Sequence, residues 1–220
     1  GRKMVSLLRT IGIEPAYLGK AERCCGSVAR KVGEDKLARE KAEACFSDFA
    51  EAGAKTVLTS CPGCASALNH YEDIPKARGI EVLHISQYLD RRLDDIDLRK
   101  KDMKGTVTYH DPCDLGRELG VYDAPRRVLA AAVKSPVVEM ERSRERSSCC
   151  GSGAGVRSAF PGLADAISRD RISQAEAAGA GTIVTSCPWC VQSLLQCQGR
   201  TARVKVLDLV EVVHESIKKA

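Results

Sequence analysis

Eleven of the 220 residues are cysteines, and most of them fall into two kinds of short motif. The pairs at 24–25 and 149–150 are adjacent in sequence, and each is followed at once by a glycine. Adjacent side chains diverge, so such a pair does not easily form an unstrained disulfide. Two C-x-x-C motifs occupy 61–64 and 187–190, and Cys113 stands alone. These residue types point to metal ligation or to redox chemistry.

The spacing of the motifs favours iron–sulfur chemistry. In the second half of the chain 35 residues separate Cys113 from Cys149, and 36 separate the adjacent pair from Cys187. In the first half 35 residues separate Cys25 from Cys61. Thiolates delivered by distant loops suit an iron–sulfur cluster, which is held by cysteine sulfur. The diverging sulfurs of an adjacent pair can reach different irons of one compact cluster.

Composition excludes several other classes of function. With 44% hydrophobic residues the chain can bury a real core, and its net charge of +5 is spread among residues of both signs. Aromatic residues make up only 4%, too few for stacking platforms, so no nucleic-acid partner is expected. Apolar runs are too short for membrane insertion, and no secretory signal is visible. Many cysteines without a signal predict reduced thiols and a cytoplasmic location, with membrane association only through a partner subunit.

The sequence contains an internal repeat that divides it into two similar halves. The segment AEAGAKTVLTSCPGCASAL at 50–68 returns as AEAAGAGTIVTSCPWCVQSL at 175–194. The segment at 79–90 is echoed at 202–213, and the Cys-Cys-Gly motif also returns at a nearly constant offset. A repeat of this length indicates duplicated domains rather than a short solenoid unit.

The repeat predicts the domain boundaries. We expect a first repeat at 1–97 and a second at 104–220, joined by the polar, charged segment 96–105. On this register the first-half counterpart of Cys113 falls about a dozen residues before Gly1. The first repeat is therefore expected to be truncated at its N-terminus.

Strands alternating with helices predict an α/β fold with parallel sheets. Short apolar segments at 106–110, 137–140 and 182–185 are expected to form buried strands. Every cysteine motif is expected to follow a strand, because loops converge at the carboxyl edge of a parallel sheet and bind ligands there. The helix after each motif directs its positive N-terminus to the same place, which lowers the pKa of a thiol.

A long helix is expected before each C-x-x-C strand. These helices are expected to end at Gly53 and near Gly179, since glycine is the common residue just past a helix end. The residues expected to face the core are Ala38, Ala42, Cys45 and Phe49 in the first helix, and Leu163, Ile167, Ile172 and Ala175 in the second. Each repeat is thus a small parallel sheet flanked by helices, with cysteines at the carboxyl ends of the strands.

A lone cysteine, a long gap, Cys-Cys-Gly, another gap and C-x-x-C resemble the cysteine-rich CCG domain of the heterodisulfide reductase family. The segments YHDPCDLGRELGVYDAPR (109–126) and VEMERSRERSSCCGSGAGVR (138–157) look most like the catalytic subunits of membrane-linked heterodisulfide reductases. They are also similar to the iron–sulfur subunits of glycolate and lactate oxidases. The resemblance covers essentially the whole chain in two pseudo-symmetric CCG repeats.

The resemblance implies two [4Fe-4S]-type clusters, which in heterodisulfide reductases have a noncubane form and reduce a disulfide as a pair. The ligands of the second-repeat cluster would be Cys113, Cys149, Cys150, Cys187 and Cys190. Those of the first, an incomplete set, would be Cys24, Cys25, Cys61 and Cys64. No flavin or nucleotide is expected. The resemblance also implies a small disulfide substrate and partner subunits that carry electrons, of ferredoxin, flavoprotein or cytochrome b type.

Three other functions stay open at this point. A non-catalytic electron-transfer subunit of a glycolate- or lactate-type dehydrogenase would use the same clusters. A thioredoxin-like thiol–disulfide oxidoreductase would use the two strand–C-x-x-C–helix units, but it leaves the adjacent pairs and Cys113 unexplained. A structural zinc site is also built from C-x-x-C pairs, although zinc modules space these pairs far more closely.

Residues outside the motifs are interpreted as structural. His110 is compatible with a hydrogen-bond donor or proton source near the metal, but its pattern favours a satisfied structural histidine. His84 belongs to no motif. Cys45 is interpreted as a core thiol, because it lies on the apolar face of its helix.

Overall fold

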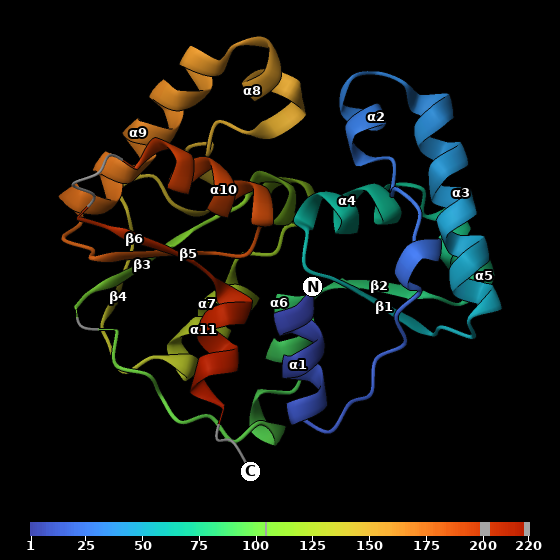
Figure 1. Cartoon of the computed structure of the whole chain (residues 1–220), viewed down its shortest axis with the longest axis horizontal. Coiled ribbons are helices and arrows are strands. Elements are labelled where there is room, and N and C mark those ends of the chain that lie inside the picture. The colour runs from blue at the N-terminus through green and yellow to red at the C-terminus, as the bar shows by residue number, and fades with distance from the viewer. Residues whose placement is uncertain (104, 199–202, 218–220) are drawn as a thin grey trace.

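The computed structural model places two α/β halves side by side, each built on parallel strands and covered by helices (Figure 1). It describes residues 1–103, 105–198 and 203–217. Lys104 in the predicted junction, Ala202 in the repeated segment and the last three residues of the predicted second repeat lie outside the described residues. The expectation of an α/β fold with small parallel sheets flanked by helices is confirmed.

The second half contains a four-stranded parallel sheet in the order β4-β3-β5-β6. Its strands are β3 (Val107–His110), β4 (Val137–Val138), β5 (Thr182–Thr185) and β6 (Lys205–Asp208). Every residue of β3 and β5 is buried, as is typical of central strands in a sheet covered on both faces. The register places His110 beside Thr185, so both strands end at the same level.

The first half contains a two-stranded parallel sheet. It consists of β1 (Thr56–Thr59) and β2 (Glu81–His84), paired so that Thr59 lies beside His84. By the sequence repeat, β1 corresponds to β5 and β2 to β6. Both sheets therefore direct the carboxyl end of one strand into a C-x-x-C motif.

The helices of the two halves follow the same order. In the first half they are α1 (Arg2–Thr10), α2 (Ser27–Lys31), α3 (Asp35–Glu51), α4 (Pro62–His70), α5 (Asp73–Arg78) and α6 (Ile85–Asp90). In the second they are α7 (Asp123–Ala132), α8 (Val156–Ala159), α9 (Pro161–Ala177), α10 (Pro188–Cys197) and α11 (Leu209–Ser216). Short turns complete the set: 3-10 turns η1 (Gly19–Ala21), η2 (Leu93–Asp95), η4 (Arg144–Arg146) and η5 (Gly153–Gly155), and a π-helical turn η3 (Asp114–Glu118). Among the described residues, every helix is too short or too polar to cross a membrane.

One hydrophobic core joins the two halves. It contains Leu7 and Leu8 of α1 and Leu89 of α6 together with Leu129 of α7 and Val213 of α11, all at most 1% exposed. Helix α1 packs on α11, and α6 packs on α7. Since α1 corresponds to α7 and α6 to α11, these two contacts are equivalent under an approximate two-fold symmetry. The seam between the halves is thus a packed, symmetric interface.

Two of the sequence expectations are wrong in detail. The pair at 24–25 follows the 3-10 turn Gly19–Ala21 rather than a strand. On α9 the expected core residue Ala175 is buried, but Leu163 is 55% exposed, and the other buried residues are Ala164, Ser168 and Arg171. Small side chains on this face let α9 approach the neighbouring Cys-Cys-Gly loop closely. The expected helix ends are correct, because α3 and α9 each stop two residues before a glycine with a φ of +70°.

Candidate metal centre

Seven cysteine sulfurs meet at the seam, where β1 and β5 end. The Sγ atoms of Cys25 and Cys64 lie 3.2 Å apart. The decisive contact lies between Cys61 of the first half and Cys187 of the second, whose thiols are close enough for each to shift the pKa of the other. In spatial order, the contacts run through Cys25, Cys64, Cys61, Cys187, Cys190, Cys150 and Cys149, which we call the sulfur row. The structure therefore brings seven of the nine predicted ligands into one continuous group.

Helix starts position the two C-x-x-C motifs. Cys61 and Cys187 are the N-cap residues of α4 and α10, and Pro62 and Pro188 occupy the first helical positions. Proline suits this position because its missing N–H would have no helical partner there. The positive ends of the two helices thus face each other across the seam and favour ionised sulfur between them.

Glycine is required after each adjacent cysteine pair. Gly26 and Gly151 have φ values of +79° and +86°, in the left-handed region. A Cβ at Gly151 would lie 2.3 Å from the carbonyl oxygen of Ala164, and one at Gly26 would lie 2.8 Å from that of Ala38. Each loop therefore turns directly against the backbone of a long helix. The Gly151 N–H also donates to the Sγ of Cys149 at 3.3 Å.

The acid–base properties of the sulfur row suit a bound cation. Hydrogen bonds from Cys187 and Cys64 lower the pKa of Cys61 to about 2. Hydrogen bonds from its sulfur neighbours, and then from His110, lower the pKa of Cys150. The pKa of Cys64 is raised, because its thiol proton is shared with the sulfurs on either side of it. Thiolates are the form in which cysteine binds metal, so a row of buried and half-buried, partly ionised sulfurs fits an iron–sulfur centre.

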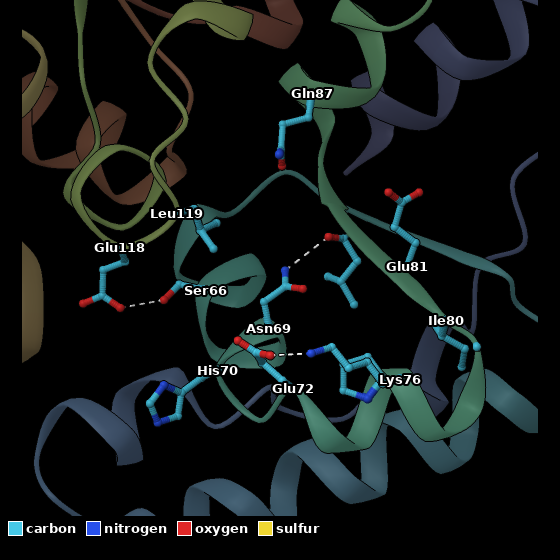
Figure 2. A pocket seen from close by; sticks show the side chains of 13 residues that line it. Ser66, Asn69, His70, Glu72, Lys76, Ile80, Glu81, Gln87, Glu118 and Leu119 are labelled. Atoms are coloured by element: carbon cyan, nitrogen blue, oxygen red, sulfur yellow. Dashed lines mark hydrogen bonds and ion pairs between the residues drawn. The ribbon is translucent and has the colours of Figure 1, made fainter.

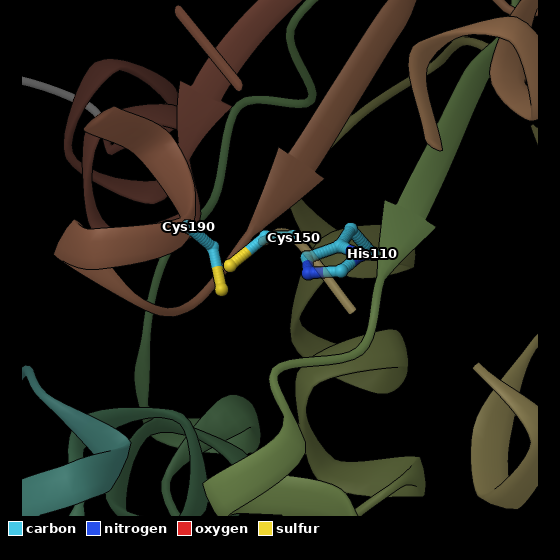
Figure 3. A group of neighbouring side chains, drawn as sticks. All are labelled: His110, Cys150 and Cys190. Atoms are coloured by element: carbon cyan, nitrogen blue, oxygen red, sulfur yellow. The ribbon is translucent and has the colours of Figure 1, made fainter. Parts of the chain in front are cut away.

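His110 lies against the second-half end of the sulfur row (Figure 3). The ligand atoms of His110, Cys150 and Cys190 all lie within 4.8 Å of one another, and all three residues are buried. Sequence reasoning favoured a purely structural role for this histidine. Its place at the last residue of β3, three residues before Cys113, is the signal that predicts its position at the carboxyl edge of the sheet.

Two predicted ligands lie outside the sulfur row. Cys113 is half-buried beside Asp114, whose Oδ1 lies 3.9 Å from its Sγ, and its charge interacts with that of Cys150. Cys24 is exposed and lines a hollow of about 330 Å³ next to α3. Metal ligation by all nine cysteines stays a prediction, and these two are the ones that lie outside the row.

His84 lies close to both C-x-x-C loops. It is the last residue of β2 and is fully buried, and its Nδ1 accepts the N–H of Ser86 at 3.2 Å to cap α6. Nε2, on the other side of its ring, has no hydrogen-bond partner among the described residues, and the backbone of Ser60 and Ser186, the residues just before Cys61 and Cys187, lies near enough to act on its pKa. Sequence reasoning gave His84 no role. Its surroundings form only when the two halves dock, and no short motif in the sequence indicates that docking.

This burial predicts an acid-labile fold. Burial lowers the pKa of His84 to about 4. As the pH falls, His84 binds a proton in the unfolded chain before it does so in the folded protein. The free energy of unfolding is therefore highest above about pH 6.5 and falls by about 3 kcal/mol as the pH drops to 4. We expect His84→Asn, which keeps an acceptor for the helix cap, to lose less stability over this range than the wild type. Urea unfolding at several pH values measures this, with exposed His70→Asn as the control; equal losses in the wild type and His84→Asn would exclude His84 as the titrating group.

A separate hollow of about 980 Å³ lies beside α4 and β2 (Figure 2). Its lining is largely polar and includes Asn69, Lys76 and Glu81, with no cysteine among the described lining residues. At its edge the Ser66 hydroxyl donates to the Glu118 carboxylate at 2.7 Å, which ties α4 to the π-helical turn of the second half. This hollow is therefore distinct from the sulfur row.

Comparison with known proteins places the chain among cysteine-rich proteins. The family model described as a cysteine-rich domain, CCG, matches residues 1–69 and 107–194. One subunit of the dihydromethanophenazine:CoB–CoM heterodisulfide reductase of Methanosarcina barkeri is 37% identical over 96% of this chain and 53% of its own length. The EtfAB:quinone oxidoreductase of Syntrophomonas wolfei is 33% identical over 99% of this chain and 32% of its own length. One subunit of the fumarate reductase (CoM/CoB) of Methanothermobacter marburgensis is 33% identical over 97% of this chain and 42% of its own length.

The chain spans about half the length, or less, of these relatives. Each of the two matched segments contains one Cys-Cys-Gly and one C-x-x-C motif, and each supplies one half of the sulfur row. The resemblance to the CCG domain is confirmed, and the chain belongs to the CCG family of cysteine-rich domain proteins.

Proposed function

We propose that this chain is part of an iron–sulfur oxidoreductase of the heterodisulfide reductase type, which reduces a small disulfide at clusters held by its CCG motifs. The observation that carries the proposal is the Cys61–Cys187 contact, which joins the cysteine sets of both repeats into one row. The 37% identity to a heterodisulfide reductase subunit over almost the whole chain supports the same function.

Two [4Fe-4S]-type clusters, of the noncubane form, would occupy the sulfur row. The ligands of the second-repeat cluster would be Cys113, Cys149, Cys150, Cys187 and Cys190. Those of the first would be Cys24, Cys25, Cys61 and Cys64. The donor set supports this, because seven sulfurs in one continuous row exceed the four ligands of a single tetrahedral ion and suit multi-iron centres.

Reduction of a disulfide to two thiols consumes two electrons and two protons. Clusters bound here would supply the electrons one at a time, after receiving them from a partner subunit of ferredoxin, flavoprotein or cytochrome b type. The chain contributes geometry: the helix starts at Cys61 and Cys187 hold the two cysteine sets next to each other, within reach of both sulfurs of one small disulfide. Burial of Cys150, Cys187 and Cys190 excludes water from the sulfurs of the second half.

An electron-transfer role without substrate chemistry is the second candidate. Two of the relatives are named as oxidoreductases of other kinds, an EtfAB:quinone oxidoreductase and a fumarate reductase. A relay in a glycolate- or lactate-type dehydrogenase would use the same sulfur row. It would pass electrons between partner subunits and would not bind a disulfide.

Metal and sulfide analysis of anaerobically purified protein tests the proposal. We expect iron and acid-labile sulfide in similar amounts and little zinc, with paramagnetic signals that change when a small disulfide is added to the reduced protein. If the protein contains clusters whose signals do not change with any disulfide, disulfide reduction is excluded and the electron-transfer function is retained. Protein that contains zinc, or no metal, would contradict both functions.

A further inference from the structure

Arg171 of α9 is a buried cation without an acidic partner. It is 0% exposed, and no carboxylate among the described residues forms an ion pair with it. Asp111, the acid that acts on it most strongly, is paired with Arg126 at 2.6 Å instead. Burial lowers the pKa of Arg171 to about 10, so it still carries its charge at neutral pH. Burying an uncompensated charge costs free energy, so a compensating negative group is expected nearby.

The guanidinium is held in one orientation by neutral acceptors. Its Nη atoms donate to the Arg142 carbonyl at 2.7 Å, to Gln174 at 2.8 Å and to the Ser147 hydroxyl at 3.2 Å. Its Nε donates to Nδ1 of His110 at 3.0 Å. The acceptors come from three separate segments, which fix the arginine next to the sulfur row.

This contact fixes the proton of His110. Arginine has no acceptor, so Nδ1 of His110 accepts this bond and carries no proton. A neutral ring whose Nδ1 accepts a hydrogen bond carries its proton on Nε2. Within the described residues Nε2 has no hydrogen-bond partner, and a nitrogen of this ring lies within 4.8 Å of the sulfurs of Cys150 and Cys190 (Figure 3). A line of contacts therefore runs from Arg171 through His110 to Cys150.

The first half lacks this cation. The offset of 126 residues that relates Cys64 to Cys190 also relates Ala38 to Ala164 and Cys45 to Arg171. The equivalence is structural, because Ala38 and Ala164 pack in the same way against Gly26 and Gly151. Burial raises the pKa of Cys45 to about 11, so the position of the buried cation is occupied in the first half by a neutral thiol.

We propose that Arg171 and His110 raise the reduction potential of the second-repeat cluster above that of the first, through the buried charge and a hydrogen bond to Cys150. The inference rests on the proposed function, since it requires clusters on both cysteine sets. Hydrogen bonds to ligand sulfur and nearby positive charge both stabilise a reduced, more negative cluster. Electrons that enter either cluster therefore reduce the second-repeat cluster preferentially. Arg171 acts here as a positioning residue and as a fixed charge, not as a ligand.

Redox titration of the full chain with its clusters loaded, followed by paramagnetic resonance, tests this inference. In the wild type we expect two transitions, and in Arg171→Met the higher one shifts to lower potential while the other stays. Arg169→Met is the matched control, because it removes a charge from the exposed side of the same helix and moves neither transition. Arg171→Met protein with wild-type iron content and both potentials unchanged would overturn the inference, and so would a shift of the lower transition.

Substitutions at His110 keep the test decisive if Arg171→Met does not fold. His110→Leu removes the donor, and we expect it to lower the potential of the same transition. His110→Gln keeps an N–H near the position of Nε2, and we expect it to restore most of the wild-type potential. Equal potentials in both variants and the wild type would contradict the proposed hydrogen bond. Wild-type protein without iron would contradict the proposed function instead, so the two failures are distinguishable.

Discussion

Cys150→Ala is expected to remove the second-repeat cluster and about half of the iron bound by the wild type. Cys150 lies in the middle of the second-half part of the sulfur row, where it contacts Cys149, Cys190 and His110. The loop itself should stay in place, because its anchor is the Cys150 carbonyl oxygen. That oxygen accepts the hydroxyls of Ser168 at 2.6 Å and Ser193 at 2.7 Å, and neither bond involves the sulfur.

Iron and sulfide analysis of Cys150→Ala measures the loss, and Cys197→Ala is its matched control. Cys197 is half-buried, whereas Cys150 is buried; the Cys197 thiol donates to Asp165 at 3.1 Å and lies outside the sulfur row. We expect Cys197→Ala to keep the wild-type iron content. Full iron content in Cys150→Ala would show that this sulfur is not a ligand.

Gly151→Ala is expected to destabilise the protein by about 3 kcal/mol or more, from left-handed backbone strain and from a clash that α9 cannot relieve. The new Cβ would lie 2.3 Å from a backbone oxygen rather than from the end of a flexible side chain. The loop must therefore move away from α9 and take both adjacent cysteines with it. We expect the second-repeat cluster to be lost together with the stability.

Gly153→Ala, in the same loop, is the control for this prediction. Its φ lies outside the left-handed region, and a Cβ there would meet nothing within 4 Å. Urea unfolding should place Gly153→Ala close to the wild type and Gly151→Ala far below it. Similar stabilities for the two variants would contradict the close packing of the Cys-Cys-Gly loop on α9.

Local patterns were sufficient to predict much of the architecture. The strand at 182–185 and the helix stops before Gly53 and Gly179 follow from apolar runs and turn residues, which act over a few residues. The repeat correctly predicted equivalent helices in the two halves. These features depend on neighbours in sequence, so the sequence alone carries them.

Burial of polar residues could not be predicted in the same way. On α9 the apolar Leu163 was expected inside, but the structure buries Arg171. The acceptors that make this burial tolerable, such as His110 and the Arg142 carbonyl, come from segments far along the chain. The spacing of Ala164, Ser168 and Ala175 does mark a face of small residues, and Arg171 falls on it.

The contact between the two cysteine sets also could not be predicted from the sequence. Each set was predicted to gather its own sulfurs, and the structure adds the Cys61–Cys187 contact between them. That contact depends on how the two halves dock through α1, α6, α7 and α11. Docking of this kind is a property of whole surfaces, and no short motif encodes it.

The shared core has a consequence for how the protein is made. Helix α1 leaves the ribosome well before the surface of α11 on which it packs has been synthesised. Until then the first half exposes apolar residues, and Cys61 has no Cys187 to face. We expect maturation of the metal centre to wait for translation to pass α11, so that iron is inserted only after both halves have been synthesised.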